Sequence, residues 1–254
     1  MTGYALLVEY DGAGLVGWQR QPSGLSVQEV IEAAAAPLNG GTPPAATAAG
    51  RTDAGVHAEG QVVQLALASE LPPARLRAAL DFHTRPHRIA IRAACFAPDG
   101  WSPRFSAVMR HYRYRILNRA AKPALEAGRV WHLPQPLDAA AMHRAAQRLL
   151  GRHDFSAYRA ASCQAEHALR TLDALDVVRA GEEIHIHVRA RSFLHHQVRN
   201  LVGTLREVGL GRRDEAWPRQ VLDGRDRRAA GQTAPAEGLT FLRVDYDPPL
   251  PWGS

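Results

Sequence analysis

The order of the predicted elements in the first part of the chain constrains its fold most. Short runs rich in apolar and aromatic residues, typical of strands, alternate with two stretches that have the apolar spacing of amphipathic helices. From the N-terminus we expect a strand at 4–10, a helix after Ser26, strands at 44–49 and 61–67, a helix over PPARLRAAL and a strand at 88–96. This β-α-β-β-α-β order is the split βαβ, or ferredoxin-like, unit.

The ends of the first predicted helix are marked in the sequence. Ser26 and Glu29 have the spacing of a capping box, in which each side chain bonds to the backbone of the other residue. The apolar pattern continues until Pro37 and Asn39-Gly40, which are residues that end a helix.

The second part of the chain repeats the same order after a Pro- and Gly-containing stretch, APDGWSP. The expected elements are a strand at 107–117, a helix capped by Asp138, strands at 172–179 and 184–190, a helix at 194–209 and a strand at 242–246, with an insertion at 212–238 before that last strand. We therefore predict an α+β fold with two pseudo-repeated ferredoxin-like halves, 1–103 and 104–254. Their sheets are expected to join into a mainly antiparallel sheet with a central cleft.

Composition excludes several classes of protein. Hydrophobic residues make up 46% and charged residues 22% of the 254 residues, so a buried core is expected and wholesale disorder is excluded. No apolar run is long enough to cross a bilayer and the N-terminus lacks a signal-peptide pattern, so we expect a cytoplasmic protein. Cys95 and Cys163 lie in no CxxC or Cys/His cluster, which argues against disulfide, iron–sulfur and thiolate zinc sites. Both are expected to be buried thiols.

The basic residues are almost all arginines. Lys122 is the single lysine among 31 basic residues, and the net charge is +6 with a pI near 9.9. Arginine forms planar, bidentate pairs with phosphates and stacks on bases, so this excess fits a nucleic-acid partner. A GC-rich genome would produce the same excess, and charge alone therefore identifies no partner.

The segment GRTDAGVHA, between two predicted strands, offers the clearest candidate chemistry. Gly50 and Gly55 allow a tight turn, and Arg51 lies close enough in sequence for its guanidinium to reach the Asp53 carboxylate. Such a pair keeps the carboxylate ionised, as a nucleophile or a stabiliser of positive charge needs. A structural salt bridge in a turn is the commoner meaning of an Arg-x-Asp sequence.

This motif and six further segments make the chain resemble the bacterial tRNA pseudouridine synthase A family. GRTDAGVHA follows EYDGAGLVGWQRQ and SVQEVIE, as in that family. The similarity continues through PRFSAVMRHYRY, LDAAAMHRAAQRLLGRHDFSAYRA, SFLHHQVRNLVGTLREVG and APAEGLTFLRVDY. The resemblance therefore covers nearly the whole chain, in order.

The resemblance implies an enzyme that isomerises uridine to pseudouridine at positions 38, 39 and 40 in the anticodon stem-loop of tRNA. The base is detached at N1 and rejoined through C5, so no redox cofactor, metal or nucleotide is expected. The resemblance also implies a homodimer. It leaves open which tRNAs and which of the three positions are modified, how the dimer forms, and whether the aspartate attacks the ribose or the base first.

Four residues match the functional positions of the family. Asp53 corresponds to its catalytic aspartate, and Arg51 to an arginine that pairs with phosphate or holds the target nucleotide out of the stack. Arg199, in HHQVR, corresponds to the arginine that pairs with that aspartate. Tyr112 corresponds to the tyrosine that stacks on the target base near C5, whereas we expect Tyr114, on the same strand face, to be a core residue.

The chain departs from the family in two places. His83-Thr84-Arg85-Pro86 replaces the usual Asn followed by Leu-Pro, and Ser102 replaces a common histidine. Neither falls on the catalytic motif, so these departures concern substrate contacts more than chemistry.

Other readings of the sequence are weaker. His185 and His187 share a strand face and could hold zinc, but we find no acidic or thiolate residue spaced to complete the site, so a polar sheet face is expected. The alternative from another class is a non-catalytic RNA-binding protein with paired RRM-like sheets, against which only GRTD and Arg199 discriminate. A glycosidase-like hydrolase would need two close carboxylates, and only Asp53 is convincing.

Overall fold

The computed structural model describes residues 1–252, which form two compact units. The first unit contains Met1–Arg110 and the chain from Thr240 onward, and the second contains His111–Leu239. The halves expected from the sequence, 1–103 and 104–254, place the last strand differently. That strand, β11 (Leu239–Tyr246), groups with the first unit because it pairs in parallel with β3 there, Thr240 opposite His57.

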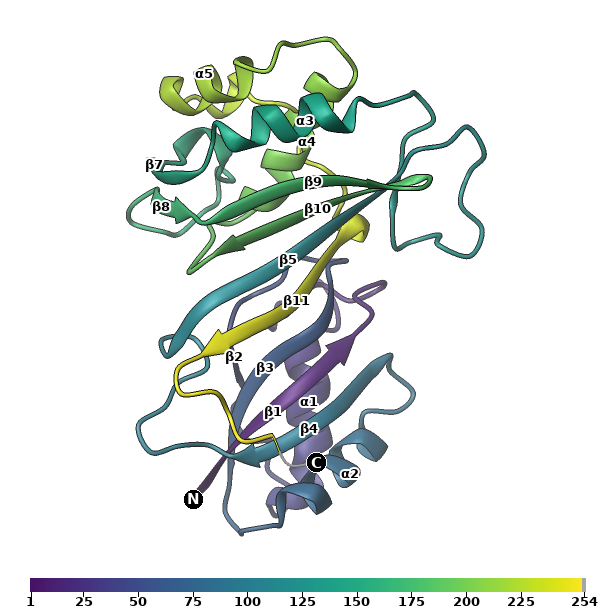
Figure 1. The fold of residues 1–254 in the computed structure, drawn as a ribbon. Coiled ribbons are helices and arrows are strands. Elements are labelled where there is room, and N and C mark those ends of the chain that lie inside the picture. The colour runs from purple at the N-terminus through teal and green to yellow at the C-terminus, as the bar shows by residue number, and fades with distance from the viewer. Residues whose placement is uncertain (253–254) are drawn as a thin grey trace. The chain divides into compact units, whose positions relative to one another are not determined.

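The first unit has the predicted β-α-β-β-α-β order (Figure 1). Its elements are β1 (Thr2–Tyr10), α1 (Val27–Ala35) followed by the 3₁₀ turn η1 (Ala36–Asn39), β2 (Thr47–Ala48), β3 (His57–Leu67), α2 (Pro73–His83) and β4 (Ile89–Phe96). β1 lies between β3 and β4 and is antiparallel to both. The backbone of Tyr10, at the end of β1, is opposite Ala58 of β3 and Ile89 of β4.

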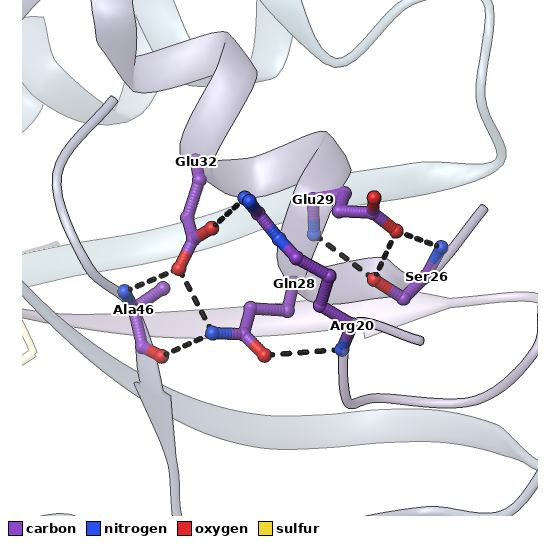
Figure 2. Close-up of polar contacts among 6 residues, drawn as sticks. All are labelled: Arg20, Ser26, Gln28, Glu29, Glu32 and Ala46. Atoms are coloured by element: carbon purple, nitrogen blue, oxygen red, sulfur yellow. Dashed lines mark hydrogen bonds and ion pairs between the residues drawn. The ribbon is translucent and has the colours of Figure 1, made fainter. Parts of the chain in front are cut away.

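Helix α1 begins at the predicted capping box (Figure 2). The Glu29 backbone N donates to Ser26 Oγ at 3.2 Å, and the Ser26 backbone N donates to the Glu29 carboxylate at 3.0 Å. These bonds satisfy two backbone donors that a helix start would leave unpaired. Val27 and Ile31 are completely buried, which fixes the apolar face of the helix in the core.

The second unit repeats the pattern with additional short elements. It contains β5 (Ala107–Leu117, entering from the first unit), β6 (Trp131–His132), α3 (Ala139–Gln147), β7 (Gly151–Asp154), η2 (Ser156–Tyr158), β8 (Leu169–Leu172), β9 (Ala174–Ala180), β10 (Glu183–Ala190), α4 (Gln197–Gly209), α5 (Trp217–Gly224), η3 (Arg227–Ala229) and η4 (Ala236–Gly238). β10 lies between β5 and β9. Along β10, Ile184, Ile186 and Val188 are completely buried, as strand alternation requires.

The predicted α+β class and mainly antiparallel sheet are confirmed, and the central cleft stays a prediction. Asp138 caps α3 as expected, accepting the Ala141 backbone N–H at 2.9 Å.

Cys95 is buried, but the expectation that Cys163 is also buried is wrong, because Cys163 lies in a partly exposed turn after η2. No helix within residues 1–252 has the length and apolar character of a membrane span.

Candidate active site

Asp53 lies in the turn that joins β2 to β3. Its backbone carbonyl accepts the Val56 N–H at 3.1 Å, which closes the turn. The Asp53 side chain is half-buried, whereas the Arg51 side chain is exposed. The turn therefore presents a carboxylate that is partly shielded from water and a guanidinium that is free to meet solvent or an anion.

Buried side chains hold the backbone that leads into this turn. Gln61 Nε2 donates to the Gly50 carbonyl at 2.8 Å, and the Tyr10 hydroxyl is 2.7 Å from Thr52 Oγ1. Burial raises the pKa of Tyr10 to about 12, against the smaller lowering by Thr52 and Gln61, so its hydroxyl keeps its proton at neutral pH. The residues on both sides of Arg51 are thus held by groups from β1 and β3.

Arg110 of β5 holds the same backbone one residue earlier. Its guanidinium donates twice to the Ala49 carbonyl, from Nε at 3.1 Å and from Nη2 at 2.6 Å, and once to the Arg104 carbonyl at 2.8 Å. Arg110 is only 7% exposed. A buried guanidinium with several donors fixes two chain segments at once, here the entry to the Asp53 turn and the segment before β5.

The Gly-rich loop between β1 and α1 covers the other side of the turn. The Trp18 backbone N donates to the Thr52 carbonyl at 3.0 Å, and the Gly55 N–H donates to the Leu15 carbonyl at 3.3 Å. Gly17 has φ +100°, and a Cβ there would lie 2.6 Å from the Thr52 carbonyl oxygen. Only glycine allows this approach, so the loop and the turn depend on each other's shape.

A buried carboxylate, Glu32 of α1, ties this loop to the segment before β2 (Figure 2). Glu32 is 5% exposed and forms an ion pair with Arg20 of the loop. Its other oxygen accepts the Ala46 backbone N–H at 2.9 Å and Gln28 Nε2 at 2.9 Å. Gln28 in turn accepts the Arg20 backbone N–H at 3.2 Å. Glu32 therefore links both segments that shape the Asp53 turn.

In the second unit, Tyr112 and Tyr114 differ in their surroundings. Tyr112 is 8% exposed and its ring packs edge-on against Phe193, with centroids 5.1 Å apart. Tyr114 is completely buried and its hydroxyl donates to the Pro235 carbonyl at 2.7 Å. The prediction that Tyr114 is a core residue is confirmed. Its burial raises the pKa of Tyr114 well above the usual value.

Arg199 lies in the first turn of α4 and is held by the segment before η4. Its Nε donates to the Ala234 carbonyl at 2.8 Å, while the Ala234 N–H donates to the Arg199 carbonyl at 3.1 Å. This reciprocal pair of bonds fixes the side chain from Cβ to Nε. The position of the two terminal nitrogens of the Arg199 guanidinium is thereby restricted.

The segment Gly231–Pro235, which we call the strap, is anchored to α4 by Asn200. The Asn200 amide oxygen accepts Thr233 Oγ1 at 2.7 Å and Arg227 Nη2 at 3.0 Å, and its amide nitrogen donates to the Tyr158 carbonyl at 2.8 Å. Arg227 also donates to the Gly231 carbonyl at 2.9 Å. Burial lowers the pKa of Arg227 below its usual value, and the electrostatic interaction with Tyr158 partly offsets this lowering.

The strap also approaches the helix backbone closely. A Cβ on Gly203 of α4 would lie 1.7 Å from the Gln232 carbonyl oxygen, so no larger residue fits there without moving the strap. Asp53 and Arg51 belong to the first unit, and Tyr112 and Arg199 to the second. The pairing of Asp53 with Arg199 stays a prediction.

Comparison with known proteins decides the family. A tRNA pseudouridine synthase family model matches residues 6–106 and 145–247. The matched residues include three of the four candidate site residues, Arg51, Asp53 and Arg199, but not Tyr112. The chain belongs to the tRNA pseudouridine synthase family. It is an isomerase that acts on uridine in tRNA.

Relatives support the family over the full length. The chain is 59% identical over 248 residues to tRNA pseudouridine synthase A of Acidiphilium cryptum, with 97% of each chain covered. It is 54% identical to the protein of the same name from a Methylobacterium species, over 99% of this chain and all of the relative. A Gluconobacter oxydans relative with this name is 47% identical over 97% of this chain and 90% of its own length.

Sequence reasoning missed the residues that support the synthase site. Four buried polar side chains each bond to a backbone group of a distant segment: Gln61, Glu32, Arg110 and Asn200. Gln61 and Arg110 each share a strand face with buried apolar residues, so a polar residue at these two positions is a signal that could have found them, because a buried polar group needs partners. Glu32 and Asn200 lie off the apolar faces of their helices and carry no such signal.

The surroundings of His185 and His187 differ from the expectation. The sequence was expected to offer no acidic residue near His185 and His187, but Glu183 lies two residues before His185 on β10, and its carboxylate is 2.8 Å from His185 Nε2. Glu183 also accepts two bonds from Arg115, at 2.7 and 2.9 Å, and hydrogen bonding to Arg115 lowers the pKa of Glu183 to about 2. The guanidinium occupies the carboxylate, so the face is polar as expected and unsuited to a cation.

Proposed function

We propose that this synthase modifies uridines 38, 39 and 40 in the anticodon stem-loop of tRNA. The family membership supports the reaction, and the similarity to proteins named tRNA pseudouridine synthase A supports the region of tRNA. The observation that carries the proposal is the Asp53 turn, whose backbone carbonyls are held by Gln61, Arg110 and the Trp18 backbone N–H. A catalytic carboxylate needs such fixed placement, because small displacements cost large factors in rate.

In the proposed reaction the N1–C1′ glycosidic bond breaks and a C5–C1′ bond forms. The detached base turns so that C5 faces C1′, the proton leaves C5, and N1 regains a proton, so atoms and charge balance without an oxidant or a hydrolytic water. Asp53 provides the carboxylate that attacks the ribose or the base ring and is released at the end. No metal or small-molecule cofactor is expected to take part.

The other three residues take supporting roles in this proposal. Arg199, aimed by its bonds to Ala234, pairs with the Asp53 carboxylate and orients it. Arg51, which is exposed beside the turn, pairs with a phosphate or holds the target nucleotide out of the base stack. Tyr112 stacks on the target base, with its hydroxyl near C5. The edge contact with Phe193 sets its ring plane.

We also propose that the enzyme is a homodimer and works in the cytoplasm, where its substrate tRNA is found. The resemblance to the synthase A family supports the dimer. Light scattering of the purified protein should give twice the chain mass of 27.8 kDa. A mass of one chain at micromolar concentration would contradict the dimer.

The test of the proposed function is direct mapping of pseudouridine. Unmodified tRNAs are incubated with purified protein after exhaustive chelation, and pseudouridine is located by chemical labelling and sequencing. We expect it at positions 38 to 40 and nowhere else. Binding of tRNA without formation of any pseudouridine would favour the non-catalytic RNA-binding alternative. Loss of pseudouridine formation after chelation, followed by its recovery when zinc is added, would contradict the metal-free mechanism.

A further inference from the structure

We propose that the end of α2 and the turn that follows it, residues 82–88, bind a backbone phosphate of the tRNA anticodon arm through Arg85. We call this segment the basic turn. It reads FHTRPHR, with two arginines, two histidines and no acidic residue. This inference rests on the proposed function and adds a contact site for its substrate.

The basic turn and the Asp53 turn lie at the same end of the sheet of the first unit. The Asp53 turn leads directly into β3 and the basic turn directly into β4, and both strands flank β1 (Figure 1). At that end Tyr10 of β1 pairs with Ala58 on one side and with Ile89 on the other. Strands two places apart in a sheet are roughly 10 Å apart, so RNA bound at Asp53 passes close to the basic turn.

The exposed groups of the basic turn suit a nucleic acid. Phe82 is 63% exposed, and the Arg85 guanidinium lies over its ring, 5.7 Å from the ring centroid. The ring restricts the guanidinium while leaving its outer face open, and this lowers the entropy lost when a phosphate binds. An exposed aromatic under an arginine also offers a nucleotide both a flat surface and a charge.

The backbone of the basic turn is held in place. Thr84 is 1% exposed, and its hydroxyl lies 2.9 Å from the Ile89 carbonyl and 3.1 Å from the Asp81 carbonyl. Arg88 forms an ion pair with Asp11 at 2.7 Å, and the Asp11 N–H donates to the Arg88 carbonyl at 3.0 Å.

Contacts of Asp11 also connect the basic turn to the start of β3. The second oxygen of Asp11 is 3.1 Å from His57 Nδ1, which accepts the Gly12 backbone N–H at 3.1 Å. Because His57 begins β3 directly after the Asp53 turn, the two turns are tied together. The basic turn is thus a preformed surface at a fixed place beside the Asp53 turn.

The test compares Arg85→Ala with Arg75→Ala, a matched control on the same helix region. Arg75 is also exposed but lies in the first turn of α2, roughly 12 Å along the helix from its last residue, His83. The probe is an anticodon stem-loop RNA, with Kd measured over a series of salt concentrations and with kcat and KM measured separately.

We expect Arg85→Ala to weaken binding about 10-fold and to reduce the salt slope of log Kd by about one, with the loss in KM and not in kcat. Arg85→Lys should restore most of the salt slope, and Arg75→Ala should bind as wild type. Equal affinity and slope for Arg85→Ala and wild type, or equal losses in both alanine variants, would overturn the proposal. Because binding is measured directly, this result can be read even if the protein formed no pseudouridine.

Discussion

The two units hold their functional groups in different ways. In the first unit the Asp53 turn is an irregular segment, and its backbone carbonyls are held one by one, by Gln61, Arg110 and the loop residue Trp18. In the second unit Tyr112 and Arg199 lie on regular elements, and the strap that aims Arg199 centres on one amide, Asn200, with further bonds between Gly231 and both Arg227 and Thr204. Support is spread over several residues in the first unit and concentrated in the second.

This difference reflects the backbone that each unit must hold. A strand or helix satisfies its own backbone bonds, so only the direction of a side chain remains to be set. A turn leaves carbonyls and N–H groups unpaired, and each needs a separate partner. The comparison predicts that single substitutions in the supporting residues are tolerated better in the first unit than in the second.

The largest effect is expected for Asp53 itself. Asp53→Asn removes the charge of the attacking oxygen at nearly constant volume, so folding and tRNA affinity should persist while kcat falls by at least about 10³-fold. Single-turnover assays with tRNA, checked by mass spectrometry for deamidation back to Asp, measure this. Substantial product from the Asn protein would refute Asp53 as nucleophile.

The next largest effect is expected at Tyr112 in the second unit. Tyr112→Phe keeps the ring and its contact with Phe193, so binding should be unchanged, while kcat falls about 10²-fold if the hydroxyl helps to remove the C5 proton. The matched variant Tyr114→Phe loses the bond to Pro235 and should lower stability instead. Wild-type turnover by Tyr112→Phe would leave Tyr112 with stacking alone.

Substitution of Asn200 tests the concentrated support of the second unit. Asn200→Ala removes three hydrogen bonds of a completely buried side chain and should cost about 2 to 4 kcal/mol in the free energy of unfolding, with a fall in kcat as Arg199 loses its strap. Asn200→Asp keeps both acceptor contacts and should retain more activity. Denaturant unfolding and kinetics check both, and equal kcat values for the two variants would show that the strap does not aim Arg199.

The smallest effect is expected in the first unit, at Glu32. Glu32→Gln keeps an acceptor for the Ala46 N–H but loses the ion pair with Arg20, so we expect a few-fold fall in kcat with little change in KM. Glu29→Gln, one turn earlier in the same helix, keeps the capping box and should leave kcat unchanged. A Glu32→Gln loss as large as that of Asn200→Ala would contradict the distributed support of the Asp53 turn.

The first unit also contains the capping-box carboxylate, whose pKa shift gives a pH dependence. Hydrogen bonds from Ser26 lower the pKa of Glu29. A lowered folded-state pKa contributes stability above the unfolded pKa, and that contribution is lost as the pH falls through the folded value. Glu29→Gln should therefore flatten the acid side of the stability profile slightly.

Much of the fold could be predicted from local sequence, because strand and helix periods and caps are local properties. The capping box of Ser26 and Glu29, the Asp138 cap and the strand at 107–117 were all predicted and are present. The candidate site residues Asp53, Arg51, Tyr112 and Arg199 were proposed from the sequence, because a resemblance depends on order and spacing alone, and their roles stay predictions. Their supporting residues could not be found in this way.

Only the tertiary structure determines the contacts between segments that lie far apart in the chain. The last strand pairs in parallel with β3 of the first unit, with Thr240 opposite His57, although the two segments lie far apart in the sequence. Likewise, Gln61 and Arg110 meet the carbonyls of residues 49 and 50 only once the strands have paired. Local sequence determines each element by its own backbone and side-chain preferences, whereas the partner of a buried polar group is determined by which segments the whole core brings together.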